Sequence, residues 1–154
     1  MSATGIQKMD ESFVNLANAR IKGQRETMEK IARNKECPFC VENLEKYHTQ
    51  EILRKGDDWL LTPNQWPYEY TEIHLIAIPT YHAEKLADLK DDSFDELLSH
   101  MKWAEKEYGV QSGGIAMRFG DTKRNGATVS HLHVHFIVPS ADKPADAKVR
   151  FKIS

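Results

Sequence analysis

Three histidines alternate with large apolar residues in one short segment in the last quarter of the chain. The segment reads His131, Leu132, His133, Val134, His135, Phe136. With 7 histidines in 154 residues, chance placement would produce such a triplet with an expectation of roughly 0.01. Residues two apart on a β-strand share a face, so the alternation predicts a half-buried strand over residues 129–138. The apolar side chains would enter the core, and the three imidazoles would line the opposite surface as one row.

A row of imidazoles is suited to two kinds of chemistry. Neutral imidazole is a common metal ligand, although histidines two apart on a strand are about 6.6 Å apart at Cβ. Neutral imidazole is also a nucleophile near pH 7, and its attack on phosphorus divides one difficult displacement into two steps. The alternative is a half-exposed polar strand face. That alternative explains the alternation but not the repeated use of one residue type.

The two cysteines of the chain, Cys37 and Cys40, are separated by two residues. A disulfide across so short a loop would constrain the unfolded chain very little, and a redox pair would need a thioredoxin-like βαβ context that the neighbouring pattern lacks. The spacing is common in structural zinc sites, where two further ligands complete a tetrahedron. The alternative is that both thiols are small buried side chains. The candidates for the two further ligands are the triad histidines, His48, His74, His82 and His100.

The rest of the chain alternates between helical and strand-like patterns. Apolar residues at helical spacing predict two helices, over residues 12–34 with a break near Gly23 and over residues 93–108. Apolar runs bounded by turn residues predict further strands, over residues 50–54, 59–62, 74–78, 113–119 and 149–153. We expect the first two of these strands to form a hairpin, because Gly and Asp residues between them suit a turn.

Composition restricts the class of protein. A chain of 154 residues with 40% apolar and 29% charged residues is long enough for one globular domain with a single core. Its apolar runs are too short to cross a bilayer, and residues 1–24 lack the apolar core of a signal peptide. We therefore expect a cytoplasmic protein with no membrane partner. The net charge of −2 provides no overall positive field, so nucleic acid is not an expected partner.

The triad segment resembles the signature of the histidine triad superfamily. His131, His133 and His135, with the apolar residues that follow each of them, match that signature. Residues 78–82, Ile-Pro-Thr-Tyr-His, are similar to the family's I-P-x-x-H. Residues 64–68, Asn-Gln-Trp-Pro-Tyr, resemble the N-x-x-P-Y of the branch that contains dinucleoside polyphosphate phosphorylases and hydrolases.

The resemblance implies a nucleotide hydrolase or nucleotidyl transferase that acts at the α-phosphate of its substrate. Candidate substrates are nucleoside phosphoramidates, adenylates and dinucleoside polyphosphates. By position in the motif, His133 would be the nucleophile that forms a covalent nucleotidyl-histidine intermediate. His135 would contact the transferring phosphate or the leaving group.

The resemblance also implies the residues that bind substrate. Asn64 matches the position that hydrogen-bonds the nucleotide ribose, and the loop of Gly126, Ala127 and Thr128 would present backbone N–H groups to phosphate oxygens. Many family members carry Gln where Ala127 stands and Asn where Gly120 stands. These departures leave an alternative open, a nucleotide-binding sensor or interaction module with negligible turnover.

Zinc-containing members of the superfamily imply a ligand set for this chain. The two cysteines would be completed by the histidine of the I-P-x-x-H segment and by the first triad histidine, which gives Cys37, Cys40, His82 and His131 as ligands of a structural Zn²⁺. His133 and His135 would remain free for chemistry. A structural zinc protein whose triad only holds metal is a further alternative.

The fold that the resemblance implies is α+β. It consists of a twisted, mostly antiparallel sheet with the helix of residues 93–108 packed on one face, an N-terminal helix and the zinc knuckle, residues 37–40. We expect residues 1–36 to form an N-terminal helical extension and residues 37–154 to form the histidine triad domain. Members of the superfamily are commonly homodimers, so a homodimer is expected here.

Overall fold

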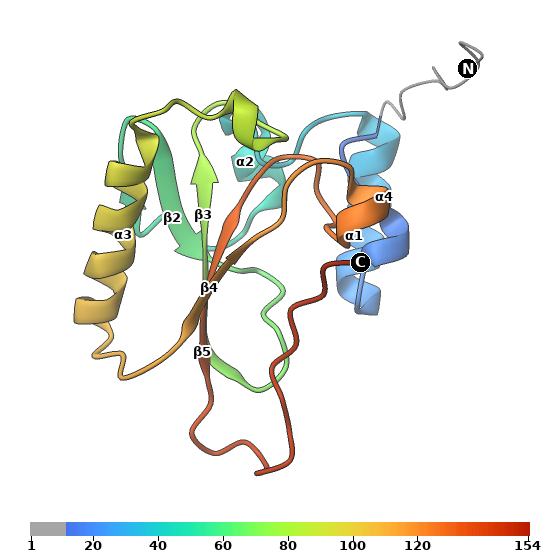
Figure 1. Ribbon diagram of the computed structural model, residues 1–154. Helices are drawn as coiled ribbons and strands as arrows, with labels where there is room; N and C mark the ends of the chain where they lie inside the picture. Colours follow the sequence, from blue (N-terminus) through green and yellow to red (C-terminus); the bar gives the residue numbers. More distant parts are fainter. Residues whose placement is uncertain (1–11) are drawn as a thin grey trace, which may run out of the picture.

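A five-stranded sheet organises the computed structural model, which describes residues 12–154 (Figure 1). The strands follow the order β1-β2-β3-β5-β4, and each neighbouring pair is antiparallel. Their bounds are Arg54–Lys55 for β1, Trp59–Pro63 for β2, Thr71–Pro79 for β3, Gly114–Met117 for β4 and Val134–Pro139 for β5. The predicted α+β fold with an antiparallel sheet is confirmed. The first 11 residues of the expected N-terminal extension lie outside the described residues.

Helices flank the sheet. Their bounds are Leu16–Asn18 for η2, Lys22–Asn34 for α1, Val41–Tyr47 for α2, Leu86–Asp88 for η3, Ser93–Glu107 for α3 and Thr122–Asn125 for α4. The structure agrees with the sequence prediction at β2, β3 and α3, and the predicted hairpin is present. Its first strand is displaced, because β1 covers only Arg54–Lys55 instead of residues 50–54, and α2 is an additional helix. In residues 12–154, every helix is too short or too polar to span a membrane.

Helix α3 covers one face of the sheet (Figure 1). Its Met101 and Ala104 belong to a buried cluster with Val134, Phe136 and Val138 of β5. The three β5 residues are two apart, so they share the face that α3 covers. The prediction that Val134 and Phe136 enter the core is therefore confirmed.

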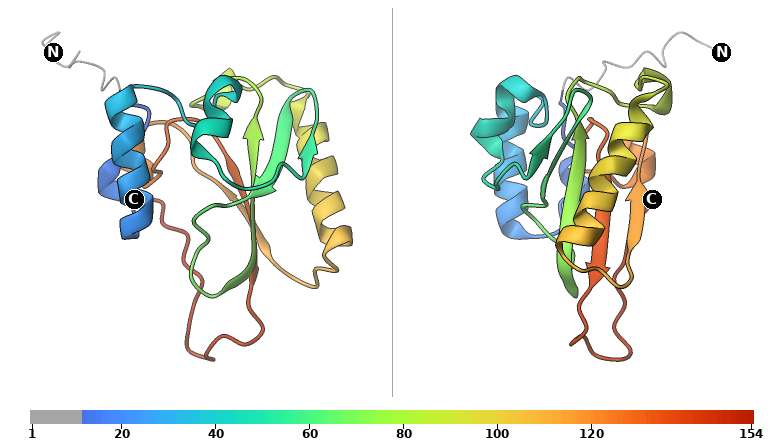
Figure 2. Two further views of the ribbon diagram at one scale, coloured as in Figure 1. Left: turned by 180° about the vertical axis from the view of Figure 1, so that it is seen from behind. Right: turned by 90° about the vertical axis from the view of Figure 1, so that its left-hand side faces the viewer.

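The opposite face of the sheet carries a second apolar layer. Ile76 and Ile78 of β3 pack there with Leu44 of α2. Helix α1 lies on the side of the molecule away from α3 (Figures 1 and 2), and its Met28 and Ile31 are buried in a separate cluster. A cavity on this face is lined by residues of α1, of β3 and of the segment that leads to α2.

The predicted helix over residues 12–34 is wrong in its first part, because α1 begins only at Lys22. The preceding residues pair with the segment before the triad instead. The Asn15 N–H donates to the Thr128 carbonyl at 2.7 Å, and Val14 forms an antiparallel bridge to the same segment. Backbone groups engaged in this way are not available for helical hydrogen bonds.

The predicted strand over residues 129–138 begins later than expected, at Val134. The residues before it donate their N–H groups to other parts of the chain. Leu132 donates to the carbonyl of Ala83 at 2.7 Å, and Ser130 donates to the N-terminal segment at 2.7 Å. These contacts take the first two triad histidines out of the sheet.

After β5 the chain makes a long loop and returns to end beside α4 (Figures 1 and 2). Residues 149–153 form no strand, contrary to the prediction. The returning tail packs closely on the loop after α4: a Cβ atom added to Gly126 would lie 3.1 Å from Cε of Lys152 and 3.4 Å from the nitrogen of Ser154. Glycine at position 126 therefore permits the close approach of the tail.

Candidate functional site

The triad histidines do not form the exposed row that the sequence predicts. His131 and His133 precede β5, and only His135 lies on the strand. His131 and His135 are 1% and 3% exposed, and His133 is partly buried. The prediction is wrong because aromatic side chains from other segments cover the imidazoles. Phe39 meets His133 edge-on at 5.1 Å between ring centroids, and Tyr68 stacks on His135 at 5.5 Å.

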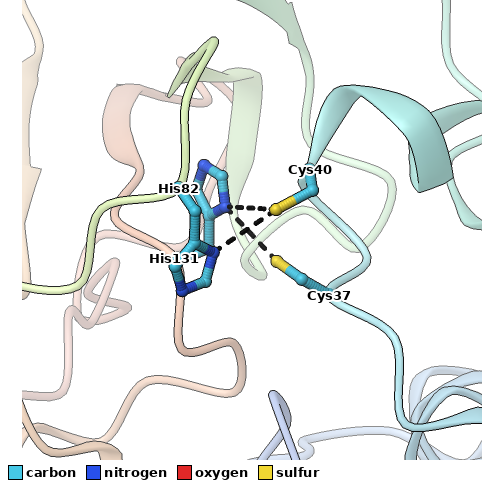
Figure 3. Close-up of side chains that lie close together, drawn as sticks. All are labelled: Cys37, Cys40, His82 and His131. Atoms are coloured by element: carbon cyan, nitrogen blue, oxygen red, sulfur yellow. Dashed lines mark hydrogen bonds between the residues drawn. The ribbon is translucent and has the colours of Figure 1, made fainter.

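Two cysteines and two histidines from separate segments meet at one point (Figure 3). The Sγ atom of Cys37 is 3.3 Å from Nδ1 of His131, and Sγ of Cys40 is 3.4 Å from Nδ1 of His82. All four ligand atoms lie within 4.8 Å of one another. Tetrahedral bonds of about 2.0–2.3 Å place nitrogen and sulfur ligands about 3.5 Å apart. The donor set and its spacing therefore fit a bound metal ion.

Hydrogen bonds on the outer side of the two imidazoles orient this cluster. Nε2 of His131 lies 3.1 Å from the carbonyl oxygen of Pro79, and Nε2 of His82 lies 3.1 Å from a carboxylate oxygen of Glu84. Both acceptors place the proton on Nε2 and leave the Nδ1 lone pair directed at the sulfur atoms. Burial raises the pKa of the Cys37 thiol to about 12.

His133 follows the cluster residue His131 by two positions and lines a cavity of about 140 Å³. Its Nδ1 is 3.0 Å from the carbonyl oxygen of His131. A carbonyl only accepts, so Nδ1 carries the proton and Nε2 carries the lone pair. Among the described residues this Nε2 has no hydrogen-bond partner. Burial lowers the pKa of His133 to about 4, so the side chain is a neutral imidazole with an available lone pair.

His135 is connected to the backbone through His74 of β3. The Tyr68 N–H donates to Nδ1 of His74 at 3.0 Å, so the proton of His74 is on Nε2. That atom is 2.8 Å from Nδ1 of His135, which accepts and leaves the His135 proton on its own Nε2. Burial lowers the pKa of His74 to about 3 and that of His135 well below its usual value.

The Nε2–H group of His135 is buried without a hydrogen-bond partner among residues 12–154. Buried polar groups in native proteins are nearly always paired, so an unpaired donor needs an explanation. His135 also lines the cavity. Both imidazoles that line the cavity thus keep an unpaired Nε2 atom, with a lone pair on His133 and a buried N–H on His135.

The cavity has an apolar side and a cationic side. Its apolar lining comes mainly from α1, the knuckle and β3, including Met28, Ile31, Phe39, Tyr47 and Ile76. Its cationic lining consists of Arg20, Arg118 and Lys152. No Asp or Glu is among the lining residues in the described part of the chain. The combination suits a ligand with an apolar or flat part and a negatively charged part.

The structure brings three of the four predicted substrate-binding residues to this cavity. Asn64, Gly126 and Thr128 line it, whereas Ala127 lines a smaller recess of about 10 Å³ on another side of His133. The amide oxygen of Asn64 accepts the N–H two residues further on at 2.8 Å. The Ala127 N–H already donates to the Asn125 side chain at 2.9 Å.

Sequence reasoning did not find Arg20, Arg118 or Lys152, and it considered His74 only as a metal ligand. His74 did carry a signal, because a histidine inside an apolar strand needs a buried hydrogen-bond partner. The three cations are isolated basic residues in separate segments. No local pattern distinguishes them from solvated surface charges.

The fold and the site together define a class. The antiparallel sheet, the three alternating histidines at and just before the start of β5 and the Cys/His cluster beside them agree with a histidine triad protein. The family model described as "Scavenger mRNA decapping enzyme C-term binding" matches residues 36–150. That match covers more than half of the chain, and the protein belongs to this family.

Individual relatives agree with this assignment. An "Uncharacterized HIT-like protein" of Chlamydia muridarum is 31% identical over 86 residues, which are 54% of this chain and 66% of that protein, just under two thirds of its length. The crystal structure of a histidine triad nucleotide-binding protein from Candida albicans has a TM-score of 0.56 at 20% identity, over 73% of this chain and 86% of that one. A Zn-bound histidine triad family protein from Mycobacterium smegmatis has a TM-score of 0.53 at 20% identity, over 77% and 85%. These two structures share the fold.

Proposed function

We propose that the protein is a nucleotide hydrolase or nucleotidyl transferase that attacks the α-phosphorus of its substrate with His133. One observation carries the proposal: the 3.0 Å contact of Nδ1 with the His131 carbonyl, which leaves the Nε2 lone pair free at the cavity. An imidazole nucleophile requires a tautomer fixed in this way. Nucleoside phosphoramidates, adenylates and dinucleoside polyphosphates are the candidate substrates.

The reaction has two steps. In the first, the Nε2 lone pair of His133 forms a bond to phosphorus while the bond to the leaving group breaks, and the leaving group departs with its electron pair. The His131 carbonyl stabilises the positive charge on the imidazole, because it accepts the Nδ1–H hydrogen bond. In the second step, water or another acceptor attacks phosphorus and releases a proton to solvent. The N–P electron pair then returns to Nε2.

His135 would stabilise the charge that develops in both steps. Its unpaired Nε2–H donates to a phosphate or leaving-group oxygen, and His74 keeps the proton on that nitrogen. A neutral imidazole is a weak acid, so it offers a hydrogen bond more readily than a proton. This arrangement favours leaving groups that depart as stable anions, such as phosphate or carboxylate, over amines.

The lining of the cavity supports a nucleotide as the substrate. The apolar side, between α1 and β3, accommodates a base, and the cationic side accommodates phosphate. Asn64, Gly126 and Thr128 are the proposed polar contacts. Ala127 contributes to the wall beside His133, since its N–H is already bonded within the loop.

We propose Zn²⁺ as the metal of the Cys37, Cys40, His82 and His131 cluster. Two thiolates and two imidazoles at these distances match its tetrahedral preference, and a fold neighbour is described as Zn-bound. When bound, the ion supplies a redox-inert link between the knuckle and the segment before β5. Metal analysis of the purified protein should find about one zinc per chain. A protein that folds fully with no stoichiometric metal would contradict the assignment.

Mass spectrometry of the protein mixed rapidly with substrate tests the catalytic proposal. We expect an added nucleotidyl group on the intact chain, mapped by peptide analysis to His133. An adduct on another residue, or turnover without any adduct during the first cycle, would contradict it. Nucleotide binding with neither adduct nor product would favour the sensor alternative. The homodimer and the cytoplasmic location remain predictions.

A further inference from the structure

No carboxylate within the described residues, 12–154, pairs with the positive charges around the cavity. These charges are carried by Arg20, Arg118 and Lys152, which line the cavity. Their hydrogen bonds go to neutral oxygen atoms. After burial and the neighbouring histidines, Arg118 and Arg20 also contribute to the lowered pKa of His135. The field of these cations therefore reaches the triad.

Arg118 connects the cationic residues to the segment of residues 64–68 and to the C-terminal tail. Its Nε donates to the Lys152 carbonyl at 2.5 Å, and its terminal nitrogen donates to the Tyr68 hydroxyl at 3.2 Å. The guanidinium lies 3.9 Å from the ring centroid of Phe151. Arg20 lies over the ring of Tyr68, 4.5 Å from its centroid. The two guanidinium groups thus approach one tyrosine, one at its face and one at its hydroxyl.

The two ends of the chain supply most of this arrangement. Arg20 precedes the range that the family model matches, residues 36–150, and Phe151 and Lys152 follow it. Phe151 also meets His135 edge-on at 5.3 Å between ring centroids. The tail that carries both residues ends beside α4 (Figure 1). The cavity is thus completed by segments outside the part of the chain that defines the family.

We propose that Arg20, Arg118 and Lys152 bind phosphate groups adjacent to the one that His133 attacks, so that the preferred substrates carry at least two linked phosphates. This inference rests on the proposed function of His133. An adenylate or a phosphoramidate carries about one negative charge at its single phosphate, whereas a chain of phosphates distributes several charges over a length that three cations can contact. Among the three candidate substrate classes, the charge balance selects the dinucleoside polyphosphates.

Calorimetric titration of the full-length, metal-loaded protein with inorganic phosphate, pyrophosphate and tripolyphosphate tests the assignment. We expect affinity to rise with the length of the anion. Arg20→Met and Lys152→Met replace each cation with an unbranched, uncharged side chain, and each should weaken tripolyphosphate binding about three- to tenfold. Their effect on inorganic phosphate should be smaller. Arg33→Met and Lys148→Met, exposed cations outside the cavity, serve as controls and should leave all three affinities unchanged.

The outcomes separate this inference from the proposed function. Equal affinity for the three anions, or equal losses in the control variants, would overturn the inference. If the His133 adduct forms equally well from single-phosphate and polyphosphate substrates in the wild type and in the Arg20→Met Lys152→Met protein, the proposed function stands and the inference fails. If binding depends on anion length and on both cations but no adduct forms, the anion site stands and the proposed function fails.

Discussion

The two ends of the histidine segment differ in how many nitrogens of each imidazole contact other groups of the protein. The metal end is His131, and the cavity end consists of His133 and His135. His131 has neighbours at both nitrogens, with Nδ1 3.3 Å from the Cys37 sulfur and Nε2 3.1 Å from the Pro79 carbonyl. His133 and His135 have a protein partner at Nδ1 only. Their Nε2 atoms have no partner in the described part of the chain. Three identical side chains at a spacing of two residues therefore have two different environments.

This difference indicates a division of roles. An imidazole whose two nitrogens are both engaged holds segments together, and its loss should affect stability more than rate. An imidazole with one free nitrogen at a cavity is available to a substrate, and its loss should affect rate more than stability. Measuring both the turnover rate and the stability of variants at the two ends therefore tests this division of roles.

The largest effect is expected at the cavity end. His133→Asn removes the proposed nucleophile, so turnover should fall at least about 10,000-fold, while the melting temperature should change little because the side chain is partly exposed. Steady-state kinetics and thermal unfolding check the two expectations. His100→Asn, at a buried histidine remote from the cavity, is the control and should show the reverse pattern. Substantial turnover by His133→Asn would contradict the catalytic role of the cavity end.

The second-largest effect is expected at the metal end, where His131 belongs to the Cys/His cluster. Cys37→Ser should lower the free energy of unfolding by more than about 3 kcal/mol, because a bound ion stabilises only the folded state. Turnover measured well below the melting temperature should fall less than in His133→Asn. Chelation of the wild type should reproduce the loss, and added zinc should reverse it. Chemical denaturation with and without chelator measures both. A wild type indifferent to chelation would contradict the structural role.

Sequence reasoning succeeds where a local pattern determines burial. Helix α3 could be predicted because Met101 and Ala104 belong to an apolar stripe at helical spacing, and the hairpin could be predicted from its Gly and Asp turn. The metal cluster is a different case. Spacing alone left several histidines open as ligands, and only the resemblance to a family selected His82 and His131.

Contacts between distant segments account for what could not be predicted. The late start of β5 follows from hydrogen bonds such as that of Leu132 to Ala83, which no periodicity encodes. The cationic side of the cavity depends on the return of the tail, which places Lys152 next to Arg118. Side chains brought together from residues 20, 118 and 152 share no spacing that a motif could contain.

A smaller effect is expected at His74, which positions His135 without contacting the substrate. His74→Phe removes the donor to Nδ1 of His135, so kcat should fall about 10- to 100-fold with a smaller change in KM. His74→Gln places an amide nitrogen near the position of Nε2 and should recover most of the rate. Kinetics of both variants, with near-ultraviolet circular dichroism as a check on folding, test this role. Equal losses in the two variants would show that packing, not the hydrogen bond, is what matters.

The smallest effect concerns the pH dependence of stability. Burial, followed by the charge of Arg20, lowers the pKa of His74 to about 3 in the folded protein, whereas an unfolded histidine titrates near 6.5. The unfolded chain therefore takes up a proton that folded His74 excludes, so stability is complete above pH 6.5 and falls as the pH drops toward 3. At pH 5.5 this loss is about 1.4 kcal/mol. His74→Gln cannot take up the proton, so urea unfolding should show a loss between pH 8 and 5.5 that is smaller by about this amount. Both proteins keep the metal cluster, whose contribution cancels, and parallel pH curves would contradict the prediction.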